Sequence, residues 1–110
     1  MTTTKLETFR AMAEAYLRDA QREQNSERTR VDCAFDAVYM YCRCVLAGAD
    51  EGREHPDVSV LQDAAAALGW RVEAMAVALA YHRRRLEPAC QARYSQLVAL
   101  ALRLKEKAPG

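Results

Sequence analysis

Apolar residues recur at every third or fourth position along almost all of this 110-residue chain. Such spacing gives an α-helix one apolar face, whereas the long apolar and polar alternation typical of strands is not found. The pattern predicts an all-α fold: an antiparallel bundle of four to five helices in one domain spanning residues 1–110, with its core in 5–105. The predicted helices cover about residues 5–23, 27–47, 57–68, 70–86 and 88–105.

Local signals for helix ends support these ranges. The hydroxyl of Ser26 can accept a hydrogen bond from a free N–H in the first turn of the second helix. Thr4 and Glu7 have the spacing of a capping box at the start of the first helix. Pro56 precedes the third helix and Gly69 follows it, which are favoured positions for these two residue types.

The second predicted helix has two apolar stripes, so we expect it to be buried on two sides and central to the bundle. One stripe holds Val31, Phe35, Val38, Cys42 and Val45, and the other holds Cys33, Ala37, Met40 and Cys44. The remaining polar line is Asp32, Asp36, Tyr39 and Arg43. Two interpretations of this line stay open: a solvated edge with spaced charges, or a polar groove where the line meets another helix.

Composition and charge narrow the class of protein. The chain is 51% hydrophobic and 28% charged, as in folded proteins, and its net charge of +1 argues against binding nucleic acid by bulk electrostatics. No segment approaches the roughly 20 uninterrupted apolar residues of a membrane helix, and the first ten residues lack the apolar run of a signal peptide. We therefore expect a cytoplasmic protein without membrane contact. Thirteen arginines against three lysines suggest a GC-rich, bacterial genome.

The four cysteines predict neither a disulfide framework nor a metal site. In a cytoplasmic protein the thiols of Cys33, Cys42, Cys44 and Cys90 should stay reduced. Cys42 and Cys44 point about 200° apart on a regular helix, so they cannot share a metal ion there. We expect buried apolar thiols and no cofactor, with a redox or metal role as the open alternative.

The sequence "YHRRRLEP" at residues 81–88 combines a histidine with three arginines. His82 shares the apolar face of the fourth predicted helix, as a hydrogen-bonded core residue or as a general acid/base. Pro88 should stop or kink this helix, which places the arginines near the negative end of the helix dipole. They fan over about 200°, which suits an extended phosphate-bearing or acidic partner better than a small pocket.

The central segment "RVDCAFDAVYMYCRCVLAG", the loop ending "EHPDVSVLQDAAAALG" and the arginine-rich segment before the last helix resemble the HEPN superfamily of helical nucleotide-binding bundles. The resemblance spans roughly Leu6 to Leu104. Members often have an aromatic and small-residue run like residues 35–37 and a histidine before the third helix, as His55 is here. Nuclease members use an Arg followed closely by a His, and this chain lacks such a pair at His55 and at His82.

The resemblance implies a non-catalytic binding or regulatory module, acting on a nucleotide, an RNA or a partner enzyme, and forming a homodimer. One alternative is a ribonuclease or toxin of the HEPN class that uses His82 and a nearby arginine. Another is a thiol-based sensor. We assign no catalytic residue, and the candidate ligand-binding or nucleic-acid-binding residues are His82, Arg83, Arg84, Arg85, Asp32, Asp36 and Arg43.

Overall fold

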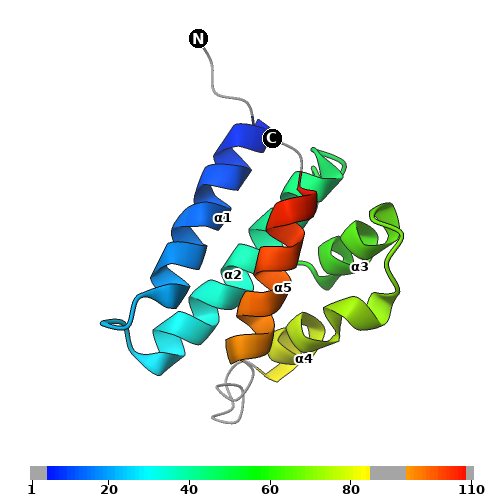
Figure 1. The fold of residues 1–110 in the computed structure, drawn as a ribbon. Helices are drawn as coiled ribbons and strands as arrows, with labels where there is room; N and C mark the ends of the chain where they lie inside the picture. Colours follow the sequence, from blue (N-terminus) through cyan, green and yellow to red (C-terminus); the bar gives the residue numbers. More distant parts are fainter. Residues whose placement is uncertain (1–4, 85–93, 109–110) are drawn as a thin grey trace.

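The computed structural model describes residues 5–84 and 94–108, and these form an all-α bundle (Figure 1). The α-helices and one short 3-10 helix, η1, follow one another along the chain, and no strand occurs in the described ranges. The all-α prediction is confirmed. The elements are α1 (Lys5–Gln21), α2 (Glu27–Leu46), α3 (Val58–Ala67), η1 (Val72–Met75), α4 (Ala76–Arg84) and α5 (Tyr94–Lys107).

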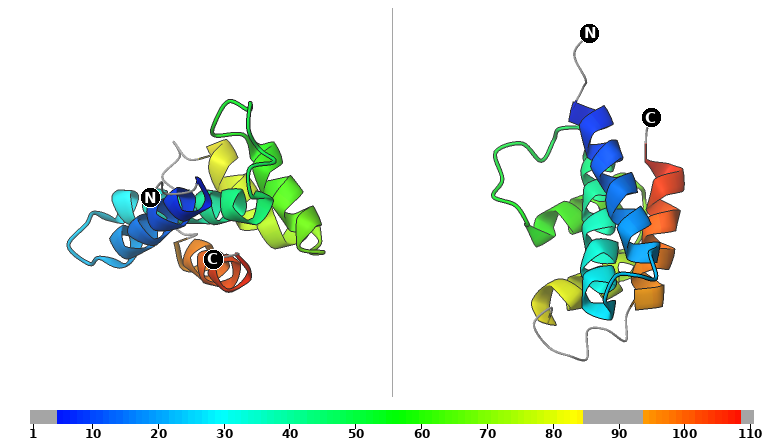
Figure 2. Two further views of the ribbon diagram at one scale, coloured as in Figure 1. Left: turned by 90° about the horizontal axis from the view of Figure 1, so that it is seen from above. Right: turned by 90° about the vertical axis from the view of Figure 1, so that its left-hand side faces the viewer.

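The helices are arranged around α2, which contacts α1, α3, α4 and α5. Helices α1 and α2 form an antiparallel pair, as predicted, whereas α5 packs against α2 and runs in the same direction (Figures 1 and 2). The shorter helices α3 and α4 lie to one side of the α1–α2 pair. The start of α1 and the end of α5 consequently lie at the same end of the molecule.

Helix α2 supplies the centre of the core, as its two apolar stripes predict. The ring of Phe35 lies 5.1 Å from that of Tyr81 in α4, measured between centroids, which links these helices through an aromatic contact. Removing so much apolar surface from water is the main force that holds the bundle together. The buried residues of α2 are Val31, Ala34, Phe35, Ala37, Val38, Tyr39, Met40, Tyr41, Cys42 and Cys44.

Two predicted helix starts are confirmed by hydrogen bonds. The Ser26 hydroxyl accepts from the N–H of Thr29 at 3.1 Å, so this residue caps α2. The Asp57 carboxylate caps α3 and accepts from the N–H of Ser59 at 2.9 Å. The third helix was predicted to begin near this residue.

Several helix ends differ from the predicted ranges, and others cannot be compared with them. The first helix ends at Gln21, and the fifth extends to Lys107. The fourth begins as η1, in which Val72 is 46% exposed. Val72 directly follows Arg71, whose backbone is extended, so no preceding helical turn determines where the Val72 side chain points. The predicted cap at Thr4, the break before Pro88 and the start of the fifth helix lie outside the described residues.

Candidate binding groove

A groove of about 250 Å³ lies where α2 meets α1 and the segment 47–57 that connects α2 to α3. We call it the α2 groove. Helix α2 supplies three of the four residues of the predicted polar line, because spacings of three and four keep them on one helix face. The lining residues are Tyr16 from α1, Phe35, Asp36, Tyr39, Met40 and Arg43 from α2, and His55 and Pro56 from the connecting segment.

Asp50 anchors the connecting segment beside this groove. Its side chain is fully buried, and its Oδ2 accepts a hydrogen bond from Nε of Arg43 at 2.6 Å. Nε2 of His55 lies 3.6 Å from the same oxygen. A buried carboxylate is unfavourable unless a charged or hydrogen-bonding partner compensates it. The bond between Asp50 and Arg43 therefore holds the connecting segment against α2. Oδ1 of Asp50 has no hydrogen-bond partner among the described residues.

Tyr39 continues this network on the other side of the His55 ring. The Tyr39 hydroxyl accepts from the N–H of Asp57 at 2.9 Å and is hydrogen-bonded to Nδ1 of His55. Burial raises the pKa of Tyr39, which keeps the hydroxyl protonated and able to donate. When it donates to Nδ1, the neutral ring carries its hydrogen on Nε2, which faces Asp50. Nδ1 of His55 is therefore used within the network, whereas Nε2 faces Asp50 at 3.6 Å, which is too long for a hydrogen bond.

Arg43 is held from two directions. Besides its bond to Asp50, its guanidinium carbon lies 4.1 Å from the centre of the Phe9 ring, in a cation–π contact with α1. The side chain is 19% exposed and lines the groove. Within the described part of the chain, its terminal nitrogens Nη1 and Nη2 have no hydrogen-bond acceptor. The groove therefore contains a fixed cation with unused donors.

The structure brings together only some of the candidate residues. Asp36 and Arg43 line the α2 groove, about 10 Å apart along the helix axis at 1.5 Å per residue. Asp32 does not line it, and this residue lies 3.8 Å from Nε of Arg28 in an ion pair on the same helix. The polar line thus has two parts: Asp32 is partly solvated, whereas Asp36, Tyr39 and Arg43 line the groove.

The candidate residues on α4 lie apart from the lining of the groove. His82 is half-buried, and its ring centroid lies 5.9 Å from that of Phe35, a residue of the groove wall. Arg83 is exposed. The side chain of Arg84 and all of Arg85 lie outside the described residues. His82 is therefore behind one wall of the groove, in contact with the core.

Sequence reasoning missed the residues that hold Arg43 in place. Asp50 lies in a segment rich in charges and turns, where nothing marks one carboxylate as buried. Phe9 and Tyr16 belong to α1, in which the sequence predicted no site residue. His55 was noted only for its position before the third helix. The signal that could have found the groove is the spacing of Asp36, Tyr39 and Arg43.

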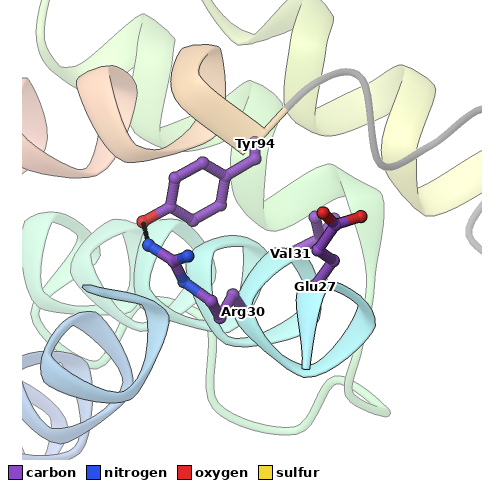
Figure 3. A pocket seen from close by; sticks show the side chains of 4 residues that line it. All are labelled: Glu27, Arg30, Val31 and Tyr94. Atoms are coloured by element: carbon purple, nitrogen blue, oxygen red, sulfur yellow. Dashed lines mark hydrogen bonds between the residues drawn. The ribbon is translucent and has the colours of Figure 1, made fainter. Parts of the chain in front are cut away.

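A second, smaller hollow of about 220 Å³ is lined by Glu27, Arg30, Val31 and Tyr94 (Figure 3). Nη2 of Arg30 donates to the Tyr94 hydroxyl at 3.0 Å, and Nε donates to the carbonyl of Ala20 at 2.9 Å. The Tyr94 hydroxyl donates to the same carbonyl at 2.8 Å. These bonds join the end of α1, the start of α2 and the start of the described part of α5.

The described cysteines lack the environment of reactive thiols. Burial raises the pKa of Cys44 to about 11 and that of Cys42 further. Burial also raises the pKa of Cys33, and the nearby carboxylate of Asp19 adds to this effect. Since the thiolate is the reactive form, these shifts do not favour a thiol sensor. Cys90 lies outside the described residues.

Comparison with protein-family models, curated proteins and solved structures found no match. In the described ranges, no helix has the length and apolar character required to cross a bilayer. The same ranges contain no cluster of three or more metal-binding side chains. Fold and groove together define the class: in the described residues, an all-helical bundle whose central helix lines an aromatic and charged groove.

Proposed function

We propose that this chain is a non-catalytic, HEPN-like binding module that holds its ligand in the α2 groove. The observation that carries the proposal is that Asp36, Tyr39 and Arg43 share one groove while the nitrogens of His55 face Tyr39 and Asp50. A general base needs a nitrogen within reach of its substrate. His55 therefore serves as part of the groove wall, and the groove offers binding groups in place of a catalytic set.

The size of the groove limits what enters it. Pockets for drug-sized ligands have volumes of about 300 to 1,000 Å³, and this groove has about 250 Å³. One ring or one side chain fits, while the rest of a larger ligand lies outside. We propose a nucleotide, an RNA segment or a partner enzyme as the source of that group, with the aromatic rings of the wall supplying stacking contacts.

Nuclear magnetic resonance titration of the ¹⁵N-labelled chain tests the proposal. We expect AMP, a short single-stranded RNA or a partner-derived peptide to shift the backbone amide signals of residues 35–43 and 53–57. Tyr16→Ala should weaken this binding, because it removes one wall from the opposite helix. A matched control is Tyr94→Phe in the second hollow. Shifts confined to residues 27–31 would place the ligand in the wrong hollow and contradict the proposal.

An RNA cleavage assay separates binding from catalysis. We expect no cleavage by the purified wild-type protein. If RNA is cut, and the activity disappears in a His82→Ala variant that still folds, the chain is a nuclease and the non-catalytic proposal is wrong. Folding of the variant is checked by circular dichroism, because His82 contacts Phe35 and its loss also affects the core.

The proposal includes a homodimer. Large apolar side chains that are partly open to solvent support it: Met12 is 40% exposed, Val72 46% and Leu102 43%. Symmetric pairing covers the same patch on both copies. Light scattering across the micromolar range should give twice the mass of 12.4 kDa, and a monomer throughout that range would contradict this part of the proposal.

A further inference from the structure

We propose that Arg43 is an oxyanion receptor: its Nη1 and Nη2 edge binds a carboxylate or phosphate group of the ligand. This inference rests on the proposed function, since it assigns a chemical class to the ligand of the α2 groove. Its basis is the combination of a fixed guanidinium with donors that the fold does not use. A guanidinium fork matches two oxygens of one oxyanion.

The first step is the orientation of the guanidinium. Asp50 fixes the Nε side at 2.6 Å, and the Phe9 ring supports the guanidinium plane at 4.1 Å. An unsupported arginine must lose side-chain freedom when it binds, and a supported one has already lost it. The affinity gained from each hydrogen bond to the ligand is therefore larger here than at an exposed arginine.

The second step concerns charge and donors. A guanidinium has five N–H donors, and the bond to Asp50 uses the one on Nε. Asp50 is fully buried, so it compensates the charge of Arg43 from the protein side and does not occupy the groove. The two terminal nitrogens remain for a ligand. Hydrogen bonds between charged groups are roughly twice as strong as neutral ones, which makes an oxyanion their best acceptor.

The third step is the shape of the remaining lining. The walls of the groove are largely aromatic, because Tyr16, Phe35 and Tyr39 contribute rings, and Tyr39 lies about one helical turn from Arg43. Such walls favour a flat or apolar group attached to the oxyanion. Asp36 lines the same groove about two helical turns away, so the oxyanion is expected at the Arg43 end. The ligand class is thus an aromatic carboxylate or an aromatic phosphate ester.

Three small probes test this on the full chain: benzoate, phenyl phosphate and the neutral isostere benzamide. Their dissociation constants are measured from the Arg43 Nε–H signal and the amide signals of residues 35–43. We expect at least one anionic probe to bind about tenfold more tightly than benzamide, from a gain of roughly one charged hydrogen bond. The tighter of the two anions shows whether the natural source is a carboxylate or a phosphate.

Variants then assign the effect to one arginine. Arg43→Gln alone would leave Asp50 buried without its cation, so it is combined with Asp50→Asn. The double variant should bind all three probes with similar affinity. Arg103→Gln is the matched control, because Arg103 also stacks on an aromatic ring, that of Trp70 at 4.4 Å, and has the same charge. This control should keep the tenfold preference. If the double variant does not fold, the Arg43 Nε–H signal of the wild type decides instead: it should shift with the anionic probes, and no shift while they bind would contradict the inference.

The outcomes separate this inference from the proposed function. If benzamide and both anions bind in the α2 groove with equal affinity, the groove binds ligands but Arg43 is no oxyanion receptor. If the preference for anions persists in the folded double variant, or is lost in Arg103→Gln, another cation is responsible and the inference is wrong. If neither these probes nor the nucleotide, RNA and peptide ligands shift the groove signals, the proposed function fails as well.

Discussion

Two arginines of α2 have similar surroundings and different uses. Arg30 and Arg43 both lie over an aromatic ring, at 4.8 Å from Tyr94 and 4.1 Å from Phe9. Arg30 donates from Nε and Nη2 to a carbonyl and a hydroxyl. Arg43 donates from Nε to a buried carboxylate. Arg30 uses Nε and Nη2 to join helices. Arg43 uses only Nε, and its two terminal nitrogens remain available in the groove.

The partners of an arginine determine how many of its N–H donors remain available for a ligand. Arg30 uses two of its five N–H donors, one on Nε and one on Nη2, for neutral partners of the fold, so one of its terminal nitrogens is already engaged. A single carboxylate compensates the charge of Arg43 through one nitrogen. The stability of the fold consequently depends on Arg43, since without it the buried Asp50 is an uncompensated charge.

The largest expected effect comes from the apolar wall that separates the groove from the core. Phe35 is 3% exposed and touches the rings of Tyr81 and His82. Phe35→Ala should lower the free energy of unfolding by about 3 to 5 kcal/mol, because it opens a cavity. Urea denaturation measures this loss. A loss below about 1 kcal/mol would mean that the groove wall contributes little to the core.

Arg43→Ala should be the next most damaging change, at about 3 kcal/mol, because it leaves the Asp50 carboxylate buried and unpaired. The double variant Arg43→Ala with Asp50→Ala should recover part of that loss, since no charge is then buried. Thermal and urea unfolding of the single and double variants provide the comparison. Equal losses in both would show that Arg43 stabilises the fold by other contacts.

Arg30→Ala should cost about 1 to 2 kcal/mol, less than the change at Arg43, because it removes hydrogen bonds to neutral groups. The carbonyl of Ala20 keeps its bond from the Tyr94 hydroxyl, so no buried acceptor loses its last partner. The same unfolding measurements apply. If this variant is less stable than Arg43→Ala, the contrast between the two arginines is wrong.

The smallest effect concerns Asp57, which is partly exposed to solvent, whereas Asp50 is fully buried. Its hydrogen bond from the Ser59 N–H lowers the pKa of Asp57 below the ordinary value of 3.8. A lowered pKa in the folded state adds stability above that ordinary value, and the addition is lost as pH falls through the folded-state pKa. Asp57→Asn keeps the cap without the charge.

Stability of the wild type and of Asp57→Asn should therefore differ at neutral pH and converge on acidification below about pH 4. Unfolding by urea at several pH values measures the difference. A difference that stays constant down to pH 2 would show that the charge of Asp57 does not stabilise α3.

Most of the fold could be predicted from the sequence because helical spacing reports local geometry. The doubled apolar stripe identified α2 as central, and Ser26 identified its first turn. The direction of α5 relative to α2 could not be predicted, since it depends on how the chain crosses the bundle. Half of the groove was visible in Asp36, Tyr39 and Arg43, which lie on one helix face. The role of Asp50 was not visible in the sequence, because it depends on how the turn-rich segment folds back to bring this residue, seven positions after Arg43, against α2.

The groove is lined by the regular helices α1 and α2 and by the connecting segment, and these parts differ in how freely they can change during evolution. Substitutions on α2 alter the core and the groove together. Residues 51–56 include two groove residues, His55 and Pro56, and none of the six is buried. Insertions or substitutions there can reshape the groove at little expense to stability, as long as Asp50 remains in place. Ligand preference in related chains should therefore diverge mainly through this segment.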